Sequence, residues 1–111
     1  MMNIKDFINA IQNRPKMYVE ELRLDYIYYI IIGFLGSNLM NKNACSLDQA
    51  YKNHFPNWLL EWVRKNINEY YEKRSFYWYH ILIDVTNSEE EAIMLFFELS
   101  DKFFEEEISK S

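Results

Sequence analysis

Five residues near the end of the chain could together form one binding surface. They recur at steps of three and four, and they are Glu91, Met94, Glu98, Asp101 and Glu105. Side chains at these steps lie on one face of an α-helix, so the spacing predicts an acidic stripe with one apolar contact. Such a stripe suits a basic protein partner, because complementary charge speeds association and disfavours wrong partners. An ordinary solvated helix face has the same pattern, and the sequence leaves both interpretations open.

Residues that commonly act as nucleophiles, bases or metal ligands are sparse. Cys45 is the single cysteine, and His54 and His80 are the two histidines. One cysteine cannot form an internal disulfide, which fits a reducing compartment, and a catalytic thiol would need a nearby base. Two histidines without companion ligands do not make a zinc site, and His80 lies in an apolar stretch that is typical of a core histidine.

Motifs for phosphate binding, metalloprotease chemistry and serine-hydrolase chemistry are also absent from the sequence. We therefore expect a protein that is not an enzyme and that needs no cofactor and no metal.

The charge of the chain is distributed unevenly. The formal net charge is −5, and it divides into +2 for residues 1–83 and −7 for residues 84–111. The acidic C-terminal part argues against direct nucleic-acid binding and favours a basic partner. Lys73 and Arg74 lie among aromatic residues, as in single-strand binders, but two charges are too few for a binding groove.

Size and composition predict one domain over residues 1–111. Half of the residues are hydrophobic, which suffices for one core without disulfides or metal. The longest apolar run, residues 26–35, is ten residues long, whereas a membrane span needs about 20. The first 14 residues lack the apolar segment of a signal peptide, so we expect a cytoplasmic protein with no membrane contact.

Hydrophobic periodicity predicts an all-α bundle of four to five helices. A first helix runs from a cap at Asn3 to about Asn13 and ends at Pro15, because proline cannot continue a helix interior. Met17 and Tyr18 then fold back as apolar anchors. A second helix over residues 25–40 is apolar on almost every side, which is typical of a central helix surrounded by neighbours.

The second half of the chain has less regular helix signals than the first half. Residues 41–56 are polar and irregular, with at most a short helix near 46–51, and a third helix begins near Pro56. Residues 75–85 favour a buried fourth helix. Their β propensity keeps an α+β fold with a strand over 76–85 as the alternative. Ser88 and Glu91 form a capping box for a last helix that ends near Glu106 and continues into a frayed acidic tail.

Four motifs, taken in order, resemble a family of small helical bacterial immunity proteins. The first is Arg14-Pro15-x-Met17-Tyr18 after a leading helix. The others are Gly33-Phe34-Leu35, then Trp58 with Trp62-Val63, then an acidic and apolar stretch over residues 90–99. The likeness covers most of the chain, and the order of the motifs carries it. Val19 and Glu20 stand where many relatives have a glycine, which predicts a differently shaped connector.

This resemblance implies a function. Proteins of this family act in toxin–immunity systems, including contact-dependent growth inhibition, where each binds and blocks a cognate toxin domain that is often a nuclease. The likeness identifies a structural signature and no shared binding residues. Combined with the acidic stripe, it predicts a cytoplasmic inhibitor that covers a basic substrate groove on the toxin.

Two alternatives come from other classes of function. One is a structural or regulatory adaptor, including a homodimer formed through Tyr70, Tyr71 and Trp78. The other is a small hydrolase or nucleic-acid binder with an unrecognised site.

Overall fold

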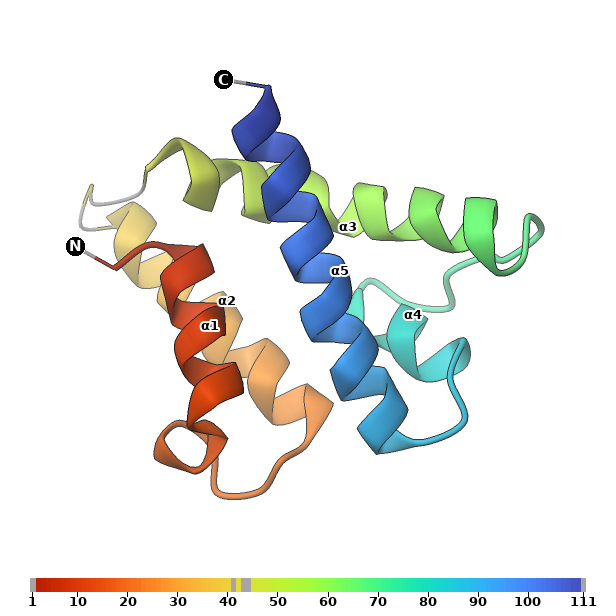
Figure 1. Cartoon of the computed structure of the whole chain (residues 1–111), viewed down its shortest axis with the longest axis horizontal. Coiled ribbons are helices and arrows are strands. Elements are labelled where there is room, and N and C mark those ends of the chain that lie inside the picture. Colours follow the sequence, from red (N-terminus) through yellow and green to blue (C-terminus); the bar gives the residue numbers. More distant parts are fainter. Residues whose placement is uncertain (1, 41, 43–44, 111) are drawn as a thin grey trace.

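The computed structural model describes residues 2–40, 42 and 45–110 (Figure 1). Within these residues the fold is all helical, which confirms the predicted class, and the alternative strand over 76–85 is not formed. The elements are α1 Ile4–Asn13, the 3₁₀ turn η1 Pro15–Met17, α2 Leu24–Met40, α3 Ser46–Asn66, α4 Tyr79–Asp84 and α5 Glu89–Ser109.

Helix α1 begins and ends as predicted. The Asn3 side chain accepts a hydrogen bond from the backbone N–H of Asp6 at 2.9 Å, and the Asp6 carboxylate accepts from the Asn3 N–H at 3.3 Å. This reciprocal pair is a capping box, which satisfies two backbone donors at the helix start. Pro15 then opens the turn η1, which ends the α-helical path.

The connector after Pro15 packs differently from the prediction. Met17 is 69% exposed and does not anchor the turn to the core. Tyr18 does contact Phe7, with the rings edge-to-face and their centroids 5.5 Å apart. Val19, which is 6% exposed, provides the buried anchor instead. The turn η1 directs Met17 to solvent and brings the chain back to the core two residues later.

The central place in the bundle belongs to α5. This helix packs against α1, α2, α3 and α4, and it crosses in front of α3 in Figure 1. The helix predicted over residues 25–40 exists as α2, but it packs against α1, α4 and α5 and leaves one side uncovered. Ile27 and Ile31 are fully buried, whereas Tyr29 and Ile32 are 54% and 42% exposed. Its apolar composition therefore reflects a covered side and an exposed apolar side.

Helix α3 begins at Ser46, ten residues before the predicted start, and Pro56 lies inside it. An interior proline costs about 3 kcal/mol or more, since it removes one hydrogen bond and crowds the preceding turn. A continuous buried stripe crosses the proline and offsets this cost. Its members, at steps of four, are Tyr51, Phe55, Leu59 and Val63.

Helix α5 is longer than predicted. It continues to Ser109, so residues 105–107 are helical and do not form a frayed tail. One contact in this last part joins it to α3, where the indole Nε1 of Trp58 donates to Glu106 Oε2 at 2.9 Å. The predicted region 75–85 contributes only the short helix α4, which buries Ile81 and Leu82 against the bundle.

One polar pair lies inside the aromatic core between α3 and α5. The hydroxyls of Tyr51 and Ser100, both at most 1% exposed, are 3.1 Å apart. Burial raises the pKa of Tyr51 well above its usual value, and the Ser100 hydrogen bond opposes this only in part. The phenol is therefore neutral in the folded protein across the ordinary pH range.

This burial predicts a loss of stability in alkali. An unfolded tyrosine ionises near pH 10, so the folded state releases its proton later than the unfolded state does. The free energy of unfolding should be unaffected by Tyr51 below about pH 10 and fall above it. Tyr51→Phe should cost about 1 kcal/mol at pH 7, because Ser100 loses its partner. It should also flatten the alkaline decline measured by urea unfolding from pH 7 to 11, and an unchanged slope would contradict this assignment.

Candidate functional site

The start of α5 is held by three hydrogen bonds. Ser88 Oγ accepts from the N–H of Glu91 at 3.1 Å, as the predicted cap requires. The Glu91 carboxylate accepts from the N–H of Asn87 at 2.9 Å, one residue before the donor of a standard capping box. Glu89 Oε1 accepts from the backbone N–H of Leu24 at 2.5 Å. The positive end of α5 is therefore fixed to the start of α2.

The five residues predicted as a binding surface all lie exposed on α5. Their spacing places them on the face opposite the buried stripe of the helix. That buried stripe comprises Ala92, Ile93, Phe96, Phe97, Leu99, Ser100, Phe103 and Phe104. The acidic stripe, Glu91, Met94, Glu98, Asp101 and Glu105, is therefore one continuous surface held on the most enclosed helix of the fold.

Within the part of the chain that the structure describes, the carboxylates of the acidic stripe are not held in ion pairs. Lys5 shares a surface depression of about 540 Å³ with Asp101 and Glu105, yet it makes no ion pair with either of them. Four negative charges without ion pairs on one helix face create a local potential that attracts cations and basic side chains.

Met94 gives the stripe one apolar contact, one helical turn from its Glu91 end. Its side chain is 66% exposed and stands between two depressions. One, of about 410 Å³, is lined by Leu22, Glu90, Ile93, Met94 and Phe97. The other, of about 380 Å³, is lined by Thr86, Glu91, Met94, Leu95 and Glu98. Apolar side chains beside carboxylates suit lysine and arginine, which bury an aliphatic stem and keep a charged head in water.

The cysteine and histidines do not form a recognisable reactive group. Cys45 is a free, exposed thiol immediately before α3, and the described residues hold no cluster of three potential metal ligands. His54 lies exposed within α3, although it was predicted to lie in a loop. His80 Nδ1 lies 2.6 Å from Ser75 Oγ, and that hydroxyl also accepts from the N–H of Tyr77, so this pair shapes a turn.

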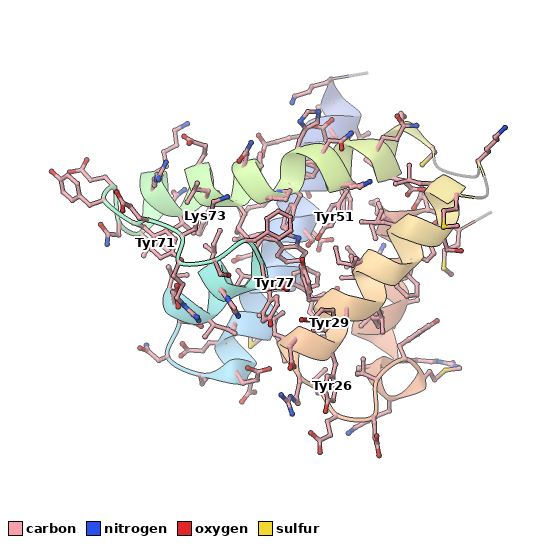
Figure 2. The ribbon with its side chains drawn as sticks, turned by 180° about the vertical axis from the view of Figure 1, so that it is seen from behind. Tyr26, Tyr29, Tyr51, Tyr71, Lys73 and Tyr77 are labelled. Atoms are coloured by element: carbon pink, nitrogen blue, oxygen red, sulfur yellow. The ribbon has the colours of Figure 1, made fainter. Side chains whose placement is uncertain are left out.

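A second exposed surface was not predicted from the sequence. We name it the aromatic face, and its members are Tyr26, Tyr29, Phe76 and Tyr77, which are 37%, 54%, 87% and 42% exposed. Figure 2 shows Tyr26, Tyr29 and Tyr77 along one side of the molecule, with α5 behind the other helices. Residues 26–35 and 76–83 were both expected to be buried. One feature of the sequence could have indicated this exposed patch. Residues 26–35 are apolar on every side of their helix.

Only some of the residues predicted to form a homodimer contact are exposed to solvent. Tyr70 is 82% exposed, but Trp78 is 7% exposed and belongs to the core. The Tyr71 hydroxyl donates to Asp84 Oδ2 at 2.7 Å. Burial and the Asp84 carboxylate raise the pKa of Tyr71. The exposed aromatic side chains in this part of the chain are therefore Tyr70, Phe76 and Tyr77.

No described helix combines the length and the apolar character that crossing a bilayer requires. Comparison of the chain with protein-family models, curated proteins and solved structures finds no match.

Proposed function

We propose that this protein is a toxin-neutralising immunity protein, which binds a basic cognate toxin domain through the acidic stripe of α5. The observation that carries the proposal is the group of four exposed carboxylates without ion pairs to any described residue, which share one face of α5 with Met94. The resemblance of the motif order to small bacterial immunity proteins supports the biological role. The proposed activity is binding.

Occlusion is the mechanism that this surface supports. A nuclease-like toxin needs a basic groove to hold phosphates. A stripe of carboxylates held on a rigid helix can enter such a groove and pair with the same lysine and arginine side chains. The exposed Met94 supplies an apolar contact beside Glu91 and Glu98. Long-range attraction between the two charged surfaces speeds the encounter.

Reversing the charge of the stripe tests this surface. The triple variant Glu98→Lys, Asp101→Lys, Glu105→Lys leaves the capping interaction of Glu91 intact. We expect it to bind the toxin domain about thirtyfold more weakly, because exposed ion pairs contribute about 0.2–1 kcal/mol each and the new charges repel. Titration calorimetry at several salt concentrations measures the change, and the wild-type affinity should fall as salt rises.

A matched variant separates this site from the total charge of the protein. Glu20, Glu69 and Glu72 are exposed and lie outside the stripe, so changing all three to lysine alters the net charge equally. This control should retain more than about half of the wild-type affinity if the acidic stripe is the docking surface. Equal loss in both triple variants would contradict the stripe as the docking surface.

The immunity role is tested in cells. The chain is co-expressed with the toxin domain encoded directly upstream of its gene, and growth rescue and co-purification are measured. Rescue by the wild-type protein and by the control triple variant, but not by the stripe variant, is the expected result. Failure of the wild-type protein both to rescue growth and to form a complex would overturn the proposed function.

A further inference from the structure

One of the two depressions beside Met94 is built from two distant parts of the chain. Leu22 comes from the connector between η1 and α2, and the other lining residues come from α5. The connector is fixed to α5, because the Glu89 carboxylate accepts from the backbone N–H of Leu24, two residues after Leu22. We name this depression the Leu22 socket, and its lining residues are Leu22, Glu90, Ile93, Met94 and Phe97.

The lining of the Leu22 socket is apolar except for one carboxylate. Ile93 and Phe97 are buried members of the core, whereas Leu22 and Met94 are exposed. The four lining residues on α5 follow one another at steps of three and one and three, so they share one side of the helix. A side chain placed in the socket would therefore contact apolar surface and the Glu90 carboxylate together.

The charge of the Leu22 socket is negative and is not balanced by a neighbouring cation of the described chain. Glu90 is exposed and forms no ion pair with any described residue. Arg23 follows Leu22 in the sequence, but it is paired with Asp25 at 2.9 Å and does not line the socket. Glu91 and Glu98 line the depression on the other side of Met94 and add to the negative potential.

This combination of shape and charge selects one class of occupant. An acidic side chain would be repelled by Glu90, and a purely apolar one would displace water from the carboxylate without replacing its hydrogen bonds. Lysine and arginine satisfy both parts of the socket, because an aliphatic stem carries their charged head. We propose that the Leu22 socket receives one lysine or arginine side chain of the toxin domain, with its stem against Ile93 and Phe97 and its head at Glu90. This inference rests on the proposed function and adds a specific contact to the acidic stripe.

The chemistry of the socket is tested on the free protein with a short basic peptide. Acetyl-Ala-Arg-Ala-amide is titrated to on the order of 10 mM, the range of weak single contacts, while NMR monitors ¹³C-labelled methionine methyl groups. The Met94 signal, assigned with Met94→Leu, should shift. Met17 and Met40, which are exposed outside the socket, should not shift. Peptides with citrulline or norleucine in place of arginine should shift Met94 at least about fivefold less, because each lacks the charge.

Two socket variants test the contact in the toxin complex. Leu22→Ala removes the support for the stem and Glu90→Gln removes the charge, and each should weaken binding of the toxin domain encoded directly upstream by about three- to tenfold. The double variant should lose less than the product of the two effects, because both contacts hold the same side chain. Met17→Ala and Glu69→Gln, at exposed positions outside the socket, are the matched controls and should stay within about twofold of the wild type.

The outcomes separate the socket from the proposed function. Equal shifts of Met94 with the arginine and citrulline peptides, or equal shifts of all three methionines, would overturn the socket. An effect of Leu22→Ala without an effect of Glu90→Gln would also overturn it, in favour of an apolar occupant. Toxin binding that is weakened in the stripe variant but unchanged in both socket variants would overturn the socket and leave the proposed function standing. Failure of the wild-type protein to bind the toxin domain would overturn both.

Discussion

Replacing Asp48 with alanine is expected to lower the free energy of unfolding by about 3 kcal/mol, because its buried carboxylate holds three helices together. Asp48 is 1% exposed. Its Oδ1 accepts from the backbone N–H of Ile4 at 2.7 Å. Its Oδ2 accepts from Asn38 Nδ2 at 3.1 Å and from the N–H of Cys45 at 3.4 Å. The starts of α1 and α3 and the end of α2 therefore converge on one side chain.

The alanine variant leaves the Ile4 N–H buried without an acceptor, and this donor accounts for much of the cost. Urea unfolding monitored by circular dichroism measures the difference. The same substitution at the exposed Asp101 is the control, with an expected change within about 0.5 kcal/mol. Asn38→Ala removes one of the three donors to Asp48. It should lower the free energy of unfolding by about 1 kcal/mol, which lies between the effects of the two aspartate variants. A change at Asp48 as small as that at Asp101 would contradict this role.

Replacing Phe55 with alanine is expected to destabilise the protein by about 4 kcal/mol. Phe55 is fully buried on α3, and its ring centroid lies 4.4 Å from Tyr51, 5.2 Å from Trp78 and 5.5 Å from Phe103. Removing the ring leaves a cavity among three aromatic side chains that cannot all move to fill it. The variant also removes the apolar contact immediately before Pro56, where α3 lacks a backbone hydrogen bond.

Phe76→Ala provides a control with identical chemistry, because Phe76 is 87% exposed. In dilute solution it should change the unfolding free energy by less than about 0.5 kcal/mol. Phe55→Leu keeps most of the volume and should cost about 1.5 kcal/mol or less. Thermal and urea unfolding of the three variants tests the order. A Phe55→Ala variant no less stable than Phe76→Ala would show that this ring cluster does not support the fold.

Local signals in the sequence were sufficient for the helix ends that depend on neighbouring residues. The cap at Asn3, the proline after Arg14 and the cap at Ser88 each act over three or four residues, and each lies where it was predicted. The acidic stripe was also predictable as a surface, because its period of three and four residues needs only that α5 be a helix. Its partner stays a prediction.

The start of α3 could not be predicted in the same way. Pro56 is a strong local signal for a helix start, and it was wrong because burial at Tyr51, Phe55 and Leu59 outweighs the local cost. Asp48 gave no sequence signal of its role, since its donors come from residues 4, 38 and 45. Contacts across tens of residues exist only after the chain has folded.

The sequence by itself favoured the helical class, with a strand over 76–85 left as the alternative, and determined the spacing of the acidic stripe, because both follow from local periodicity and capping. The tertiary structure alone decided which apolar surfaces are covered. Helices α2 and α5 both carry more apolar residues than a single contact face needs. The spacing of these residues does not indicate which of the two helices is surrounded by the others. Packing placed α5 among four helices and left Tyr29 of α2, with Phe76 beside α4, facing solvent.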